Sequence, residues 1–142
     1  YITINKGVHM TTQMALFDEQ LPFEEDKQYT ASQITDKIKW YYNNKPFYAI
    51  NDTHNTTDRI YYCDFKPRSR YMYKGKWKKI KNTRPLSPYE KARFLNVYDK
   101  NKHEFRKIDV ASLSYLRVGK MRYRVDQVPE QTYPLVTVKR LP

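Results

Sequence analysis

A run of cations and aromatic rings occupies residues 66–81 and contains no acidic residue. Its members are Lys66, Arg68, Arg70, Tyr71, Tyr73, Lys74, Lys76, Trp77, Lys78, Lys79 and Lys81. Lysine and arginine side chains can neutralise phosphate groups, and aromatic rings offer faces on which unpaired bases stack. The run therefore favours contact with nucleic acid, and an ordinary solvated face of lysines is the alternative.

The same run predicts a β-hairpin. Lys74-Gly75 suits a tight turn, because glycine readily adopts a positive φ. Met72 would then lie opposite Trp77 on one face of the hairpin. The other face would carry rings and cations together: Tyr71, Tyr73, Lys76 and Lys78. If the face is merely solvated, Met72 and Trp77 belong to the core instead.

A second hairpin carries arginines rather than lysines. Residues 116–118 and 121–125 alternate around Gly119-Lys120, which suits a type II′ turn. By period two, one face is apolar: Leu116, Val118, Met121, Tyr123 and Val125. The opposite face carries Arg117, Arg122 and Arg124, and arginine binds phosphate in a planar, bidentate way. We expect the two basic hairpins to line the same side of one sheet.

The first half of the chain supplies a helix and two strands to position these hairpins. Thr30 and Gln33 form a capping box, and apolar residues at helical spacing follow until Asn43-Asn44. Residues 47–50 and 59–65 alternate as strands. Cys63 falls on the apolar side of the second strand, so we expect a small core residue there.

The second half predicts another helix and the remaining strands. Ser87, Pro88 and Glu90 are typical of a helix start. The expected buried side of this helix is Ala92, Phe94, Leu95 and Tyr98. Residues 105–110 and 135–138 read as strands. The whole predicts one α+β domain over residues 29–142, with two helices packed on a mostly antiparallel sheet.

Composition points to an anionic partner. The chain has 142 residues and a formal net charge of +12, which suits nucleic acid better than a membrane surface or an acidic protein. It has a single cysteine and no apolar run of the ~20 residues that span a bilayer. We therefore expect a cytoplasmic protein without a membrane partner.

Residues 1–28 read as a tail outside the domain. His9-Met10 looks like a cloning scar, so residues 1–9 are left out of the fold. Residues 10–28 are mostly acidic and contain QMALF, Gln13 to Phe17. This pentapeptide resembles the Q-x-x-L-F motif by which bacterial replication and repair proteins dock on the DNA sliding clamp, with Met14 where that family often has an aliphatic residue.

The resemblance implies a role for three residues of the tail. Gln13 would fill a small polar site on the clamp, and Leu16 with Phe17 would fill an apolar pocket. The alternative is that the apolar residues of the tail pack on the chain's own body: Met14, Leu16, Phe17, Leu21 and Phe23.

Catalytic chemistry has little support in the sequence. His54, His103 and Cys63 do not show zinc-ligand spacing. Three carboxylates lie in or beside predicted strands, Asp64, Asp109 and Asp126, but their spacing fits no nuclease pattern. We expect no cofactor, no metal and no catalytic residue, and a nuclease is the enzymatic alternative.

The expected function is a DNA-binding accessory protein, with single-stranded DNA favoured. It would be a non-catalytic subunit of a bacterial, phage or mobile-element replication or repair complex that helps a polymerase or primase hold its template. Its expected partners are DNA and the sliding clamp, a polymerase or a primase. Two alternatives remain open: a phage-type inhibitor or adaptor that binds a nucleic-acid-processing enzyme, and an RNA- or ribosome-associated protein.

Overall fold

The computed structural model describes residues 18–51, 59–80, 85–129 and 131–142. Its helices are α2 (Ala31–Trp40) and α3 (Pro88–Arg93), with a 3₁₀ turn at Val110–Ser112. Its strands are β1 (Gln28–Tyr29), β2 (Phe47–Asn51), β3 (Arg59–Asp64), β4 (Arg70–Tyr73), β5 (Lys76–Lys79), β6 (Phe94–Asp99), β7 (Glu104–Asp109), β8 (Leu113–Val118), β9 (Met121–Gln127) and β10 (Val136–Arg140). In the described part of the chain, no helix is both long and apolar enough to cross a bilayer.

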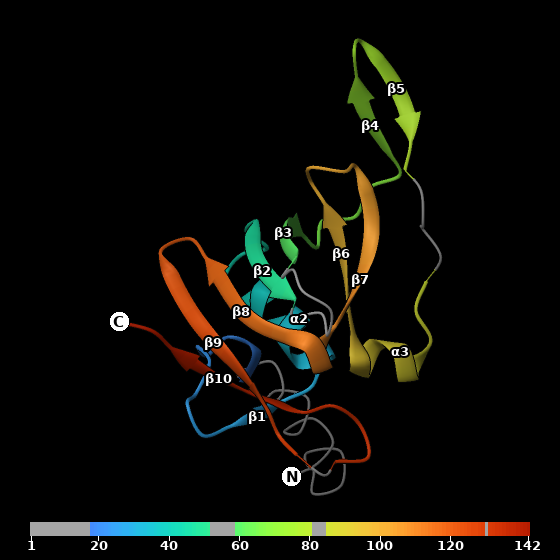
Figure 1. Cartoon of the computed structure of the whole chain (residues 1–142). Coiled ribbons are helices and arrows are strands. Elements are labelled where there is room, and N and C mark those ends of the chain that lie inside the picture. The colour runs from blue at the N-terminus through green and yellow to red at the C-terminus, as the bar shows by residue number, and fades with distance from the viewer. Residues whose placement is uncertain (1–17, 52–58, 81–84, 130) are drawn as a thin grey trace, which may run out of the picture.

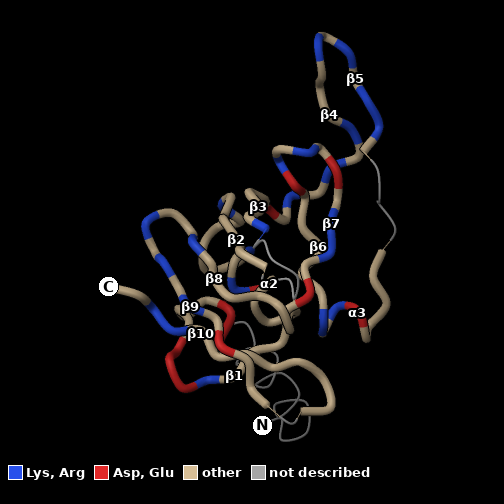
Figure 2. Tube along the Cα trace, viewed as in Figure 1, with Lys and Arg blue, Asp and Glu red and all other residues tan. Residues whose placement is uncertain are grey.

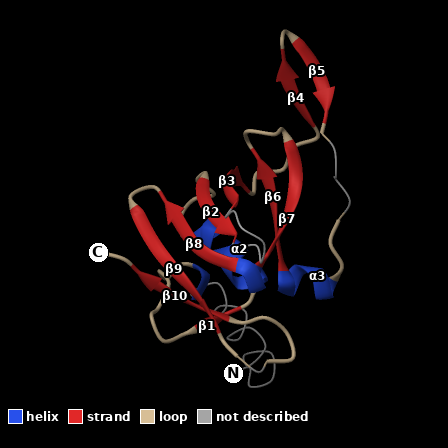
Figure 3. Ribbon diagram, in the orientation of Figure 1, coloured by secondary structure: helices blue, strands red, loops and turns tan. Residues whose placement is uncertain are grey.

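The fold is α+β, as predicted, and β-structure dominates it (Figures 1 and 3). The main sheet has 8 strands in the order β1-β10-β9-β8-β2-β3-β6-β7, and every pairing is antiparallel. The sheet curls, so it has an inner and an outer face. A separate sheet of 2 strands, β4 and β5, projects beyond this body (Figure 1).

Helix α2 fills the inner side of the curl. The Thr30 hydroxyl accepts from the Gln33 amide at 3.3 Å, and the Gln33 side chain accepts from the Thr30 amide at 2.8 Å, which is the predicted capping box. Ile34 and Ile38 are fully buried in one core cluster with the inner-face side chains of the sheet. Burying an isoleucine side chain contributes about 1.5–3 kcal/mol, so this stripe fixes the helix on the sheet.

The body begins earlier in the chain than residue 29. Phe23 is 9% exposed and its ring packs edge-on against Tyr29 and Tyr123, at centroid distances of 5.3 and 5.2 Å. Gln28–Tyr29 pairs with β10 at the edge of the sheet. Phe23 therefore packs on the chain's own body, as the alternative for the tail expects.

The prediction of a helix through residues 94–98 was wrong. Helix α3 begins as expected, with Ser87 and Glu90 in a capping box, but it ends at Arg93. Residues 94–99 form β6, which pairs with β7 from Phe94↔Asp109 to Asp99↔Glu104. Leu95 and Val97 are buried at a spacing of two, and aromatic and β-branched residues suit the pleated surface better than a helix.

Candidate nucleic-acid interface

The basic aromatic run forms the β4–β5 hairpin in the predicted register. Met72 pairs with Trp77, and Tyr71 with Lys78. The turn has positive φ at both Lys74 (+49°) and Gly75 (+78°), which is the pattern of a type I′ turn. Such a turn matches the right-handed twist of the strands, so the turn residues favour the observed register.

Both faces of the β4–β5 hairpin meet solvent. Met72 is 51% exposed and Trp77 is 62% exposed, so the alternative that places these two residues in the core is wrong. The hairpin is not part of the main sheet, and neither α2 nor α3 lies over it (Figure 1). Exposed tryptophan and methionine on a projecting element are unusual for a surface that contacts only water.

The cations of the hairpin lie over its own rings. The Nζ atoms of Lys78 and Lys74 are 4.8 and 5.2 Å from the centre of the Tyr73 ring, and the Arg70 guanidinium is 5.7 Å from that of Trp77. In the described residues, no carboxylate pairs with a cation of β4, β5 or their turn. Figure 2 shows this positive charge at the turn and along β5, while most of β4 carries no charge.

The base of the hairpin is fixed by a buried carboxylate. Asp64 is fully buried and accepts from the Arg68 guanidinium through both oxygens, at 2.5 and 2.8 Å, and from the Lys66 amide at 3.1 Å. Burial raises the pKa of Asp64, but the hydrogen bonds from Arg68 and Lys66 outweigh it, so the pKa lies below its usual value.

Arg68 therefore has a structural role in this arrangement. Its guanidinium also lies 4.1 Å from the centre of the Tyr98 ring. Further along, Tyr71 stacks on His103 with ring centres 4.6 Å apart and planes within 4°. Ile80 is buried, and its amide donates to the Ser69 carbonyl at 3.0 Å, which closes the hairpin. Lys66 is exposed beside this base, and Lys81 lies outside the described residues.

The β8–β9 hairpin shows the predicted alternation. Leu116, Val118, Tyr123 and Val125 are buried, while Arg117, Arg122 and Arg124 are exposed on the outer face, away from α2. Gly119 has a φ of +61° and Lys120 has no positive φ, in agreement with a type II′ turn.

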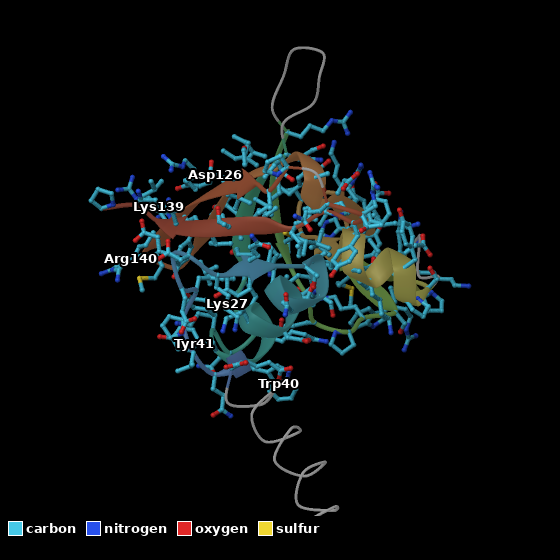
Figure 4. All side chains as sticks on the ribbon, turned by 90° about the horizontal axis from the view of Figure 1, so that it is seen from below. Lys27, Trp40, Tyr41, Asp126, Lys139 and Arg140 are labelled. Atoms are coloured by element: carbon cyan, nitrogen blue, oxygen red, sulfur yellow. The ribbon has the colours of Figure 1, made fainter. Side chains whose placement is uncertain are left out.

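Figure 4 shows Asp126 and Lys139 on β9–β10, and Trp40 at the end of α2.

The three arginines differ in what holds them. The Nε of Arg117 donates to the Gly119 carbonyl at 3.1 Å, and Arg122 donates to the carbonyl of Pro142. The Nε of Arg124 donates to Asp126 at 3.0 Å, so a carboxylate partly neutralises this arginine. Arg117 and Arg122, which face each other across the hairpin, keep their charge for an external anion.

The prediction that the two basic hairpins line the same side of one sheet was wrong, because β4 and β5 form a sheet of their own. Residues on the outer face of the main sheet lie between the two hairpins. The strand register places Arg117, Tyr48 and Tyr62 side by side on β8, β2 and β3. Lys100 lies over the Tyr62 ring at 5.7 Å, and its Nζ is 3.8 Å from Asp64 at the base of the β4–β5 hairpin. We call Arg117, Tyr48, Tyr62 and Lys100 the tyrosine row.

Sequence reasoning missed the tyrosine row. One signal was present: Tyr48 with Ile50, and Ile60 with Tyr62, place large apolar side chains at the outward positions of strands whose inward positions are also apolar. Which strands are neighbours is a non-local property, so the adjacency of these residues required the sheet order.

The carboxylates considered for a nuclease each serve an arginine. Asp64 pairs with Arg68, Asp109 accepts from Arg93 at 3.0 Å, and Asp126 pairs with Arg124. Among the described residues, no three His, Cys, Asp or Glu side chains lie close enough together to hold a metal ion. Cys63 is buried, and burial together with Asp99 and Asp64 raises its pKa, which disfavours a reactive thiolate.

The proposed docking peptide, with Gln13, Leu16 and Phe17, lies outside the described residues, so its role stays a prediction. Comparisons of the chain with protein-family models, with curated proteins and with solved structures gave no match.

Proposed function

We propose that this domain binds single-stranded DNA, as a non-catalytic accessory protein of a bacterial, phage or mobile-element replication or repair complex. The observation that carries the proposal is the β4–β5 hairpin. It projects from the body, exposes Trp77, Met72 and Tyr73 together, and none of its described cations pairs with a carboxylate.

Single-stranded DNA fits this hairpin better than a duplex does. Lysines on the turn and along β5, with Arg70 at the start of β4, can follow a phosphate backbone. Base–aromatic stacking contributes about 1–3 kcal/mol per base for unpaired bases. In a duplex the faces of the bases are already stacked on one another, so the exposed rings would have no partner. Rings and cations on one element therefore favour an unpaired strand.

The accessory role rests on the tail. A docking peptide that binds the sliding clamp, or another replication protein, would raise the local concentration of a weak DNA binder without any new DNA contact. In this setting the domain would help a polymerase or primase hold its template. Gln13, Leu16 and Phe17 are the residues assigned to docking.

Binding is tested by fluorescence anisotropy with labelled single-stranded DNA, duplex DNA and RNA over a salt series. Wild-type protein is expected to bind single-stranded DNA most tightly. The triple variant Lys76→Ala/Trp77→Ala/Lys78→Ala is expected to lose roughly tenfold or more of that affinity. Its salt slope should fall by roughly 1 to 1.5, because two phosphate contacts are lost.

The chain offers a matched control for this variant. Lys39→Ala/Trp40→Ala/Lys45→Ala removes the same residue types from exposed positions at the end of α2, where Trp40 is 58% exposed. This control should bind DNA like the wild type. Equal losses in both triple variants, or tight binding to an acidic protein with none to any oligonucleotide, would contradict the proposal, and preference for RNA would reassign it to RNA.

Docking is tested separately with the immobilised sliding clamp. Leu16→Ala/Phe17→Ala should abolish capture of the protein while leaving its DNA affinity unchanged. Capture of the variant at wild-type levels would remove the docking assignment, and the DNA-binding proposal would stand.

A further inference from the structure

The two central rings of the tyrosine row form a stacked pair on the outer face of the sheet. Tyr48 and Tyr62 are cross-strand neighbours, with ring centres 4.6 Å apart and planes tilted by 31°. Tyr48 is 41% exposed. No described helix covers this face, since α2 belongs to the core on the inner side.

A cation flanks the far side of each ring. The Arg117 guanidinium lies 5.9 Å from the centre of the Tyr48 ring, and the Lys100 Nζ lies 5.7 Å from that of Tyr62. Because β2 and β3 lie between β8 and β6 in the sheet, the order along the row is cation, ring, ring, cation. Both cations can move, since Arg117 is held by one carbonyl and Lys100 by a loose contact of 3.8 Å with Asp64.

The next row of outward side chains is apolar and ends in cations. Ile60, Ile50 and Tyr115 are neighbours on β3, β2 and β8, and Ile60 is 67% exposed. Arg124 and Lys139 continue this row on β9 and β10. The outer face thus has an apolar, aromatic middle, which is complementary to the bases of a strand. Arg124 pairs with Asp126 and Lys139 with Glu25, so Arg117 rather than these two supplies positive charge beside the rings.

We propose that the tyrosine row is a stacking platform for single-stranded nucleic acid, with one base against the outer side of each ring. This inference rests on the proposed function and assigns it a second contact surface, remote from the tip of the β4–β5 hairpin. Arg117 and Lys100 turn from the rings to the neighbouring phosphates as the bases stack. The strand then continues from Lys100 to the base of the hairpin.

The spacing of the platform selects an unpaired strand. Two bases stacked on opposite sides of the Tyr48–Tyr62 pair would lie about 12 Å apart. Consecutive bases of a duplex strand are only about 3.4 Å apart, and their faces are occupied. Only a strand that is extended and unstacked can therefore place bases on both rings.

Ring-removal variants test the platform in the same anisotropy assay, with oligothymidylate, oligouridylate and duplex DNA as probes. Tyr48→Ala and Tyr62→Leu are each expected to weaken single-strand binding by roughly tenfold, with duplex affinity changed less than about twofold. The salt slope should not change, because no cation is removed. Tyr48→Phe keeps the ring and should bind like the wild type.

Tyr133→Ala is the matched control, because Tyr133 is 46% exposed in the connection between β9 and β10. Circular dichroism of each variant reports whether the sheet is intact. If neither Tyr48→Ala nor Tyr62→Leu alters single-strand affinity while Lys76→Ala/Trp77→Ala/Lys78→Ala does, the platform is refuted and DNA binding by the hairpin stands. If wild-type protein binds no probe, both proposals fail together.

Discussion

Tyr42 and Tyr123 illustrate how single residues hold this fold together. Both rings are buried, at 8% and 2% exposure, and their hydroxyl groups hydrogen-bond to each other. Burial and this bond raise the pKa of Tyr42 above its usual value, so the pair stays neutral. The bond joins the end of α2 to β9 across the core.

The loss of unfolding free energy per hydroxyl removed should be larger in either single variant of this pair than in the double variant. Tyr42→Phe or Tyr123→Phe leaves a buried polar group without a partner, and we expect each to lower the free energy of unfolding by about 1–2 kcal/mol. The double variant should cost less than the sum. Urea unfolding of the four proteins measures this, and strict additivity would contradict the coupling.

Asp64 makes stability depend on acid pH. Its pKa is lowered in the folded protein, so its contribution is fully present above the unfolded pKa of about 3.9 and is lost as the pH falls through the folded value. Asp64→Asn should cost about 2 kcal/mol at neutral pH, since it leaves Arg68 without its bidentate partner.

The pH profile separates this effect from a simple packing defect. Unfolding free energies of wild type and Asp64→Asn should begin to converge as the pH falls below about 4, where the unfolded carboxylate takes up its proton. Convergence should be complete only below the lowered pKa of the folded protein, where the native carboxylate is protonated too. A constant difference between the two proteins from neutral to acid pH would show that the charge of Asp64 is not the cause.

At the scale of elements, the β4–β5 hairpin adds little to the core. Only Ile80 at its base is buried, and the hydrogen bond from Ile80 to Ser69 already closes the loop. Replacing residues 70–79 by an Asn-Gly turn should therefore leave the melting temperature within a few degrees of the wild type, while nucleic-acid affinity falls by roughly tenfold or more.

Calorimetry measures the melting temperature of the protein that lacks residues 70–79, and fluorescence anisotropy measures its nucleic-acid affinity, both against the wild type. The remaining loss of stability should come from Tyr71, whose ring stacks on His103. Tyr71→Ala in the full chain provides that reference. A large drop in melting temperature for the excised protein, beyond that of Tyr71→Ala, would mean that the hairpin supports the body.

How well each element could be predicted depended on how local its signal was. The capping boxes at Thr30 and Ser87, and the Lys74-Gly75 turn, involve residues within a few positions of one another, and the structure has them as expected. The sequence did not predict β6, because the helix-start signal at Ser87 says where α3 begins but not that it ends at Arg93. The pairing of residues 94–99 with β7 is what makes them a strand, and β7 lies further along the chain.

The candidate site divides in the same way. The period-two alternation located Arg117, Arg122 and Arg124 on an exposed face without knowledge of the sheet. The contacts of Lys100 with Tyr62 and of Arg68 with the Tyr98 ring depend on the pairing of β3 with β6, which no local pattern encodes. Charge alone could not distinguish the exposed Lys76 from the paired Arg68.

At the scale of the whole molecule, charge is segregated. Acidic residues gather in the segment before β1, where Glu25 pairs with Lys139 at 3.3 Å, and the β4–β5 hairpin lies far from that segment (Figure 2). The net charge of +12 is therefore unevenly spread. Such an arrangement orients the molecule as it approaches a polyanion, with the hairpin leading.

The separation of the hairpin from the core has a consequence for how this protein can change over time. Substitutions at exposed positions of β4 and β5, such as Met72 or Trp77, should change the free energy of unfolding little, because these residues lie outside the core. If the hairpin makes the proposed contact with nucleic acid, natural variation and laboratory selection can retune that contact at these positions alone. The core residues of the body are constrained by folding, whereas the exposed positions of the hairpin are free to vary.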